Sequence, residues 1–350
     1  MIDGKKSGQS MNIKKIRSIL SEQLPEEALI TDAEMGNYCS LRCGGRAALL
    51  VTAENMDELR YVLYVLKGAE VLFGAESCCG GEGVCGTGPR CCGKESCQST
   101  DKMGTADLVI LGNGTNLLVR DGGYEGAVLR LGSGFTGIRR EGNFLTAGAA
   151  APLSKIAKEA AQNGLSGLAF AAGIPASAGG AVFMNAGAYG GEMKDVVKSV
   201  RIISRDGLRE AILSGGELEF SYRTSALRKS GDIVTEVTFE LAPGDPEAIA
   251  AEMRELAERR NAKQPLAYPS AGSFFKRPQG HFAGALIEEA GLKGLSVGGA
   301  QVSALHAGFI INKGGASAGD VLALMRLVQN IVRDRSGVEL VPEVQIIGRD

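Results

Sequence analysis

The chain contains no tryptophan, and its 350 residues include only two histidines, His281 and His306. Without tryptophan, an aromatic ligand would have to stack on tyrosine, on phenylalanine or against the backbone. Two histidines are too few for a metal site built from several imidazoles, and they restrict histidine acid–base chemistry to two positions. The composition therefore argues against a multi-histidine metal enzyme.

An excess of charge of either sign is also missing. The 38 lysines and arginines nearly balance the 40 aspartates and glutamates, so neither nucleic acid nor an anionic membrane is an expected partner. The N-terminal lysines are not followed by the apolar stretch of a secretory signal. Residues 160–191 are uncharged, but their many glycines and Pro175 indicate turns and short strands instead of a membrane span. We expect a cytoplasmic protein.

Glycine is abundant, with 50 residues, and glycines permit the tight turns and close backbone approaches that surround a large cofactor. The length is enough for two or three domains. Apolar periodicity predicts helices at 55–67 and 320–333, and proline, glycine and capping signals predict helices at 152–163 and 246–260. Short apolar or alternating runs predict strands at 107–111, 233–241 and 338–347.

The preferred domain boundary is Pro243-Gly244-Asp245-Pro246, because Asp245 can cap the helix that Pro246 begins. We therefore expect an N-terminal helical lead-in at 1–38, a central region at 39–243 and a C-terminal domain at 244–350.

A glycine-rich segment at 74–104 holds most of the cysteines of the chain. These are Cys78, Cys79, Cys85, Cys91, Cys92 and Cys97. Paired cysteines suggest a metal or cluster site, but the C-x₂-C spacing of zinc sites is missing, and disulfides are not expected in the cytoplasm. We interpret the segment as a flexible surface insertion and predict no metal site.

Two glycine-rich loops are candidates for cofactor binding. The first, 112–117, follows a predicted strand, but Leu117 stands where a dinucleotide-binding fingerprint needs a third glycine. Residues 117–123 resemble a short strand and a turn instead of the required helix. The loop could hold phosphate through backbone N–H groups, although a tight turn explains it equally well. The second loop, 173–190, is rich in small residues that would let a flat ring or a pyrophosphate lie against backbone.

Ser273 follows Gly272 on a stretch bounded by Pro269 and Pro278, and Lys276 and Arg277 stand three and four residues after it. The glycine permits a tight turn and the prolines fix the backbone on either side. A serine held in this way beside two cations is suited to an anionic ligand, while the simpler alternative is a rigid turn that contains a serine.

The segments 111–121, 173–190, 220–225 and 263–278, followed by the remainder through Gly348, occur in the order of a known family. In these segments the chain resembles the flavoenzyme UDP-N-acetylenolpyruvoylglucosamine reductase, also called UDP-N-acetylmuramate dehydrogenase. The resemblance implies an α+β fold, with a two-part FAD-binding region of the vanillyl-alcohol-oxidase (PCMH) type at 39–243 and a C-terminal α+β substrate-binding domain. It also implies NADPH-dependent, FAD-mediated reduction of UDP-N-acetylglucosamine enolpyruvate to UDP-N-acetylmuramate, a peptidoglycan precursor.

The family pattern assigns roles to individual residues of this chain. It makes Ser273 the proton donor, Arg223 the group that holds the substrate carboxylate and Glu343 an assistant on the same charge. Substrate contacts fall on Tyr222, Lys263, Arg277 and His306. The residues that would line FAD are Gly44, Gly45, Gly112, Asn113, Gly114, Thr115, Asn116, Leu117, Gly173, Ile174, Pro175, Gly179, Gly180, Asn185, Gly187 and Ala188.

The chain departs from the family pattern at Arg46, where a proline is usual, and this places a charge near a presumed flavin wall. Short spacings after Arg223 and Pro278 indicate the class without the extra substrate-capping loop. The oligomeric state is not fixed by the sequence, and a monomer is compatible with it. Two alternatives stay open: a flavin-dependent oxidase of the same fold, and a metal- or redox-sensing protein centred on the cysteine-rich segment.

Overall fold

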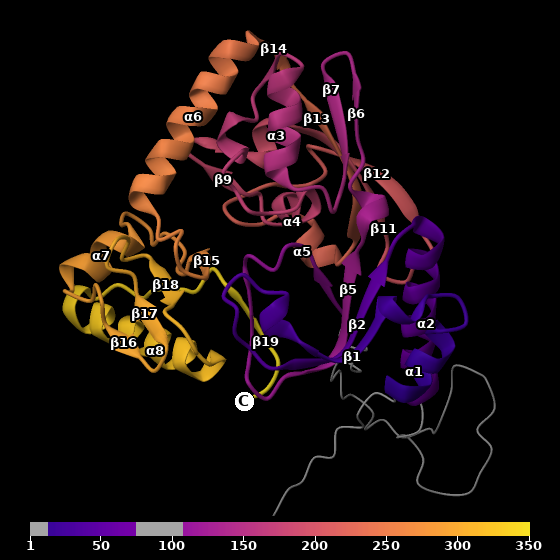
Figure 1. The fold of residues 1–350 in the computed structure, drawn as a ribbon, viewed down its shortest axis with the longest axis horizontal. Coiled ribbons are helices and arrows are strands. Elements are labelled where there is room, and N and C mark those ends of the chain that lie inside the picture. Colours follow the sequence, from indigo (N-terminus) through magenta and orange to yellow (C-terminus); the bar gives the residue numbers. More distant parts are fainter. Residues whose placement is uncertain (1–12, 75–107) are drawn as a thin grey trace, which may run out of the picture.

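The computed structural model describes residues 13–74, with side chains through Lys67, and residues 108–350. Figure 1 shows three bodies, each built around a β-sheet, with the chain passing from indigo through magenta and orange to yellow. The cysteine-rich segment and the predictions made for it lie outside the described residues.

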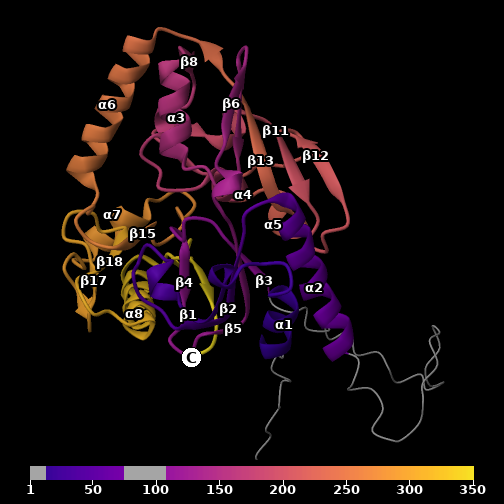
Figure 2. The same ribbon diagram turned by 45° about the vertical axis from the view of Figure 1, so that its right-hand side comes forward.

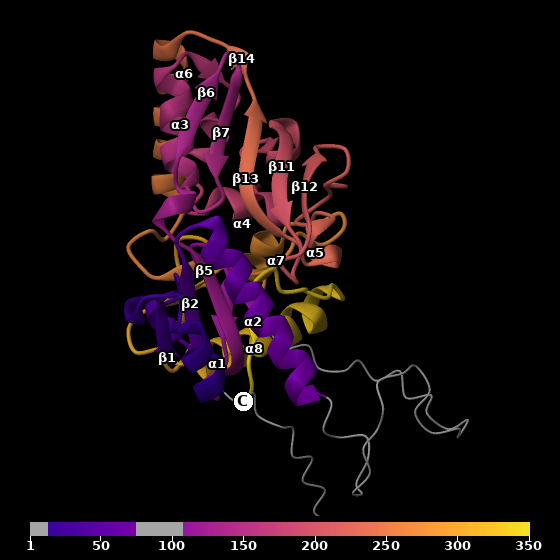
Figure 3. The same cartoon turned by 90° about the vertical axis from the view of Figure 1, so that its right-hand side faces the viewer.

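The first body is a four-stranded sheet with the strand order β1-β2-β5-β3. Its strands are β1 (Leu29–Glu34), β2 (Arg46–Ala53), β5 (Tyr124–Leu131) and β3 (Leu108–Leu111). The β2, β5 and β3 strands are parallel. Both faces of β2 are covered, because Leu49 packs in one hydrophobic cluster with Leu59 of the following helix, while the next residue, Leu50, packs in a second hydrophobic cluster on the other face. The helices are α1 (Ile13–Leu20) and α2 (Met56–Gly74), which lie together beside this sheet (Figure 3).

The second body is a five-stranded antiparallel sheet with the order β12-β11-β13-β7-β6. These strands are β12 (Glu210–Ser214), β11 (Val197–Ile203), β13 (Ile233–Glu240), β7 (Phe144–Gly148) and β6 (Ile138–Glu141). Alternate residues of β13, such as Val237 and Phe239, are buried against α3 (Leu153–Gln162) and α4 (Ala178–Phe183).

The third body follows the long helix α6 (Pro246–Lys263), which runs down one side of the molecule from the second body (Figure 2). Its sheet has the order β15-β18-β17-β16, and its helices α7 and α8 share one core with the strands. The elements are β15 (Ser270–Ser273), α7 (Ala283–Glu289), β16 (Ser296–Val297), β17 (Ala300–Val302), β18 (Phe309–Asn312) and α8 (Ala318–Ser336).

The C-terminus returns to the first body. Strand β19 (Gln345–Ile347) pairs in parallel with β4 (Leu117–Val119). Asp121, just after β4, accepts hydrogen bonds from the N–H groups of Ala318 (2.8 Å) and Gly319 (2.6 Å) in the first turn of α8. These contacts fix the third body against the first, so the two can form one site.

The remaining elements are short. They are η1 (Glu26–Ala28), η2 (Met35–Asn37), η4 (Ser133–Phe135), β8 (Leu165–Ser166), η5 (Ala169–Ala171), β9 (Gly187–Ala188), β10 (Gly191–Glu192), η6 (Met193–Asp195), α5 (Leu227–Ser230) and β14 (Ala242–Pro243). They confirm that 160–191 forms turns and short elements, and no helix of the described residues is long and apolar enough to cross a membrane.

The four predicted helices are confirmed, although α2 runs on to Gly74, past its predicted end at Lys67. The predicted caps of α6 and α8 are also confirmed. Asp245 accepts from the N–H groups of Glu247 and Ala248, and Gly337 ends α8 with a left-handed φ of 70°. Two expectations are wrong. The lead-in contains strand β1, which pairs with β2, so it is not purely helical. The strand predicted at 338–347 is also shorter than expected. Only β19 forms, and the chain before it makes an isolated bridge between Pro342 and Phe275.

Candidate active site

Arg223 stands at the tip of a tight turn in the second body. The N–H of Ser221 donates to the carbonyl of Thr224 (3.1 Å), and the N–H of Thr224 donates back to Ser221 (3.2 Å). Arg223 itself has φ of 56°, a left-handed conformation that costs a residue with a side chain on the order of 1–3 kcal/mol. Such strain persists only where the surroundings hold it, and it is concentrated at functional sites.

The guanidinium of Arg223 forms an ion pair with Glu343, which comes from the C-terminal segment. Nε of Arg223 lies 2.9 Å from Oε1 of Glu343, but the N–H is not directed at that oxygen. Nε is buried and has no hydrogen-bond acceptor among the described residues. The Arg223 side chain as a whole is 24% exposed, so the exposed part of its guanidinium can reach a ligand carboxylate.

Glu343 lies between the segment of Ser273 and the first glycine-rich loop. Its N–H donates to the carbonyl of Phe274 (2.8 Å), and its own carbonyl accepts from Nδ2 of Asn116 (3.2 Å). Burial raises the pKa of the Glu343 carboxyl, while the positive charges of Arg223 and Lys276 oppose that rise. The site therefore contains a buried carboxyl group beside two cations.

We expect the Glu343 carboxyl to titrate above the usual range of glutamate, because burial disfavours its charged form more than the two cations favour it. Its contribution to folding stability is then full at low pH and is lost as the pH rises through the raised pKa. Arg223→Ala should raise this pKa further. Infrared difference spectra during a pH titration, with Glu343→Gln to identify the band, would measure it. Titration at or below the usual value would contradict the prediction.

Ser273 ends β15 at the point where that strand crosses the C-terminal segment. The residue before it, Gly272, has φ of 75°, which breaks the strand register and leaves Ser273 exposed. The N–H of Lys276 donates to Val341 (2.8 Å), so residues 274–276 run alongside 341–343. The segments of Ser273 and Arg223 are thus both attached to the segment of Glu343.

Tyr222 makes a second connection between the second and third bodies. Its hydroxyl accepts a hydrogen bond from the N–H of Arg277 (3.0 Å), and the Arg277 guanidinium lies over the ring of Phe282 (4.6 Å). Two of the four predicted substrate residues, Tyr222 and Arg277, therefore stand beside Ser273, Arg223 and Glu343. We call these three residues the catalytic cluster, because the sequence analysis predicts them to be catalytic.

His306 and Lys263 lie apart from that cluster. Nδ1 of His306 accepts from the N–H of Gly308 (3.1 Å), and burial lowers the pKa of the imidazole, with the charges of Lys293 and Lys263 adding to this. Lys263 is exposed at the end of α6. Across the residues that the structure describes, no hydrogen bond or ion pair joins these two side chains to the catalytic cluster.

The two predicted flavin loops lie against each other. Nδ2 of Asn113 donates to the carbonyl of Pro175 (3.2 Å), and a Cβ added at Gly112 would lie 2.6 Å from Oγ of Ser177. Gly114 has φ of 62°, and a Cβ there would lie 1.9 Å from the carbonyl oxygen of Tyr38. At Gly112 and Gly114 there is no room for a side chain, so the first loop presents bare backbone at these two positions. This fits a large cofactor that is recognised through backbone groups.

Gly44 and Gly45 pack against the backbone that follows β4. A Cβ at either position would lie 2.6 Å or less from the carbonyl oxygen of Val119 or Asp121. Arg46 points its charge to the surface, where Nη2 lies 2.9 Å from Oε1 of Glu34 on the neighbouring strand. The charge that the sequence placed near the flavin wall is therefore neutralised by a cross-strand partner.

The other predicted flavin residues occupy the turns around α4 and β9. Gly179 packs on Ala149, and the N–H of Gly180 donates to the capping hydroxyl of Ser177 (3.3 Å). Asn185 is only 1% exposed and uses its side chain for protein contacts, so a flavin would reach only its backbone. Ile174 stands in the same turns, and Gly187 and Ala188 form β9. Thr115 lies in the turn before β4, and Leu117 begins that strand.

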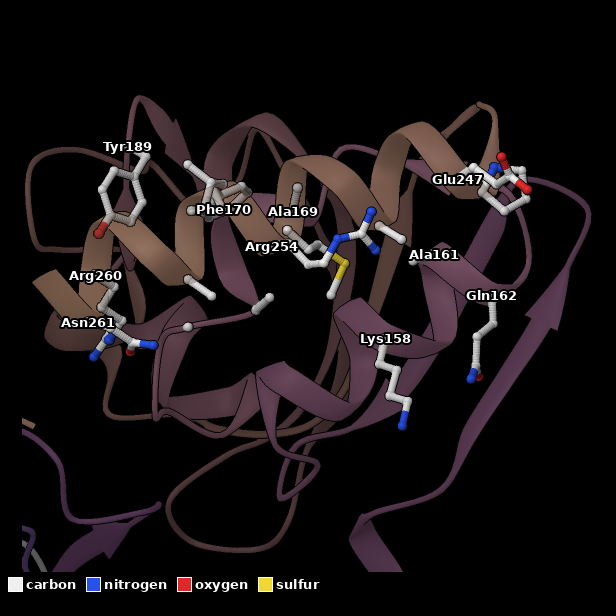
Figure 4. A pocket seen from close by; sticks show the side chains of 17 residues that line it. Lys158, Ala161, Gln162, Ala169, Phe170, Tyr189, Glu247, Arg254, Arg260 and Asn261 are labelled. Carbon is white, nitrogen blue, oxygen red and sulfur yellow. The ribbon is translucent and has the colours of Figure 1, made fainter.

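A groove of about 940 Å³ lies between α6 and α3 (Figure 4). Figure 4 shows Tyr189 and Arg260 at one end, Glu247 at the other, and Lys158 on the opposite helix. Of the predicted site residues only Gly173 lines it, and no member of the catalytic cluster does. Within 13–74 and 108–350, no group of three or more histidine, cysteine, aspartate or glutamate side chains could hold a metal ion.

Sequence reasoning missed two contributors. Asn116 was predicted only as a flavin contact, yet it also holds the backbone of Glu343. Glu192 was not singled out, although its carboxylate accepts from Nδ2 of Asn185 (2.9 Å) next to the turn of Arg223. Neither role has a local sequence signal. Asn116 and Glu343 are distant in the chain, and Asn185 and Glu192 are polar residues of ordinary appearance.

Two family models match the chain. One is described as the C-terminal domain of UDP-N-acetylenolpyruvoylglucosamine reductase and matches residues 264–347. The other is described as an FAD binding domain and matches residues 102–211. These matches confirm the predicted fold class and FAD as the predicted cofactor.

Curated relatives and a solved structure agree with the models. The UDP-N-acetylenolpyruvoylglucosamine reductase of Clostridium perfringens strain SM101 is 43% identical over 332 residues, covering 95% of this chain and 97% of the relative. The corresponding protein of Clostridium tetani is 42% identical over 338 residues, covering 96% and 98%. The crystal structure of the enzyme from Thermus caldophilus matches with a TM-score of 0.70 at 35% identity, covering 91% of this chain and 97% of that one.

Proposed function

The chain belongs to the family of UDP-N-acetylenolpyruvoylglucosamine reductases, which are FAD-dependent oxidoreductases of peptidoglycan synthesis, and we propose that it reduces UDP-N-acetylglucosamine enolpyruvate to UDP-N-acetylmuramate with NADPH as the reductant. The observation that carries this proposal is the partly buried ion pair of Arg223 and Glu343 beside the segment of Ser273. The planar guanidinium of Arg223 is suited to the carboxylate of an enolpyruvyl group.

FAD, when bound, would supply a hydride from N5 to one carbon of the substrate double bond. We propose that 39–243 holds FAD through the backbone edges of 112–117 and 173–180, together with Gly44, Gly45, Asn185, Gly187 and Ala188. The segment 244–350 would bind the substrate and would return through β19 to the first body. Tyr222, Lys263, Arg277 and His306 remain the proposed contacts to the UDP-sugar.

The residues of the chain would manage the charge and the proton of the reaction. The planar guanidinium of Arg223 would bind the substrate carboxylate and stabilise the negative charge that develops on it. Ser273 would donate the proton to carbon. Lys276, three residues further along the chain, would favour the negative charge that is then left on the serine oxygen. Glu343, whose carboxyl pKa is raised by burial, would assist in stabilising the same charge.

An anaerobic two-step titration tests the proposal. We expect the purified protein to show the absorbance of oxidised flavin, NADPH to bleach it, and one equivalent of UDP-N-acetylglucosamine enolpyruvate to restore it. A colourless protein that cannot be reconstituted with FAD would contradict the proposal. Restoration by oxygen but not by the sugar would favour the oxidase alternative. We also propose a cytoplasmic location, which cell fractionation would check.

A further inference from the structure

The turn that carries Arg223 is held to the second body at both ends. On one side, the carbonyl of Ser221 accepts a hydrogen bond from Nδ2 of Asn185 (3.1 Å). On the other side, the hydroxyl of Ser225 donates to the carbonyl of Phe183 (3.0 Å), and the Ser225 side chain is buried. Both anchors are supplied by one short stretch, 183–185, at the end of α4.

Asn185 uses both of its amide hydrogens and one lone pair of its amide oxygen in this position. Nδ2 donates to Ser221 and also to Oε2 of Glu192 (2.9 Å), while Oδ1 accepts from the N–H of Lys194 (3.0 Å). The residue is 1% exposed and has φ of 43°, a conformation that asparagine tolerates better than most residues. An amide is required here, because a carboxylate could not donate to Ser221 or to Glu192.

Glu192 extends the same network. Its carboxylate accepts from Asn185 and lies 2.9 Å from Nζ of Lys194. Its pKa is lowered by the hydrogen bond with Lys194 first, then by that of Asn185 and by the charges of Lys194 and Arg223. Glu192 thus contributes negative charge to the environment of Arg223 while it fixes the orientation of the Asn185 amide.

We propose that Asn185 is a positioning residue for Arg223: its amide fixes Ser221 and so keeps the strained turn in the conformation that presents the guanidinium to Glu343 and to the substrate carboxylate. This inference rests on the proposed function of Arg223. It differs from the prediction that Asn185 lines FAD, because its buried side chain acts through another residue and touches neither flavin nor substrate.

A double-mutant cycle between Asn185→Ala and Arg223→Ala tests the inference. We expect Asn185→Ala to slow reoxidation of the reduced flavin by the UDP-sugar about 10- to 100-fold, because a small displacement of a positioned group has effects of that size. Alanine keeps the backbone of Asn185, the only part proposed to reach FAD, so the flavin content and the reduction of the flavin by NADPH should fall far less than reoxidation. In the double variant, Asn185→Ala should add almost nothing to the loss caused by Arg223→Ala.

Two further variants complete the experiment. Asn163→Ala removes an amide with the same number of partners, since Asn163 contacts Glu159 twice and Arg140 once, but at the end of α3 away from the cluster. It should leave both half-reactions near wild type. Ser225→Ala removes the opposite anchor of the turn and should slow reoxidation by a similar factor. It therefore tests the inference independently if Asn185→Ala does not fold.

Additive losses in the cycle, or a loss of flavin or of NADPH oxidation in Asn185→Ala equal to the loss of reoxidation, would overturn the inference. Failure of the proposed function has a different signature, because wild-type protein itself would then not be reoxidised by the UDP-sugar.

Discussion

Ser273→Ala is expected to slow reoxidation of the reduced flavin by UDP-N-acetylglucosamine enolpyruvate by about 10²- to 10⁴-fold, the usual contribution of a positioned acid or base. Reduction of the flavin by NADPH should remain close to the wild-type rate, because that half-reaction transfers no proton to the sugar carbon. Stopped-flow absorbance of the flavin, recorded separately for the two half-reactions, measures both rates.

The physical reason is that alanine keeps the backbone but removes the only group proposed to carry the proton. Ser273 is exposed, and a glycine with φ of 75° precedes it, so its hydroxyl packs no core and its loss should hardly change stability. Ser270→Ala is the matched control, because it makes the same substitution at the other end of β15. If Ser273→Ala weakened both half-reactions equally, the serine would be structural and the proton would come from elsewhere.

Arg223→Lys should slow reoxidation by about 10²- to 10³-fold, the size of effect seen when a positioned donor to developing charge is lost. Lysine keeps the positive charge beside Glu343, and it has the same left-handed backbone strain to tolerate. It cannot present the planar pair of N–H groups that binds a carboxylate at two points. The loss should appear in the reoxidation rate and in the affinity for the UDP-sugar, while NADPH still reduces the flavin.

The control for this variant is Arg259→Lys on α6, where an exposed arginine pairs with Glu255 one helical turn away. Exposed pairs of this kind contribute only about 0.3–0.5 kcal/mol, so no change in either half-reaction is expected. An Arg223→Lys protein with wild-type reoxidation would show that charge alone is sufficient there, and the inferred role of Asn185 in orienting the turn would lose its basis.

Much of the fold was predictable because its signals are local. Helices α3 and α6 have apolar residues at helical spacing, and proline or aspartate marks where they begin. The two failures concern strands. The pairing of β1 with β2 depends on residues elsewhere in the chain, and the segment around Pro342 is bound to Phe275 by a single bridge that no alternation of residues announces.

The candidate site divides in the same way. The sequence by itself determined the residue types and the order of the motifs, and through family resemblance it predicted the flavin and three catalytic residues. Tertiary structure decided that Arg223 pairs with Glu343, that Asn116 and Phe274 hold Glu343 between them, and that the charge of Arg46 is neutralised by Glu34.

The physical reason is that ion pairs and side-chain-to-backbone hydrogen bonds form between atoms close in space, whatever their separation along the chain. Burial of a carboxyl group and the aim of a guanidinium depend on all three bodies at once. Sequence patterns report only the periodicity and turn chemistry of one segment at a time. The sequence thus specifies which side chains are present. Their meeting in one cluster requires the folded chain, in which β19 pairs with β4.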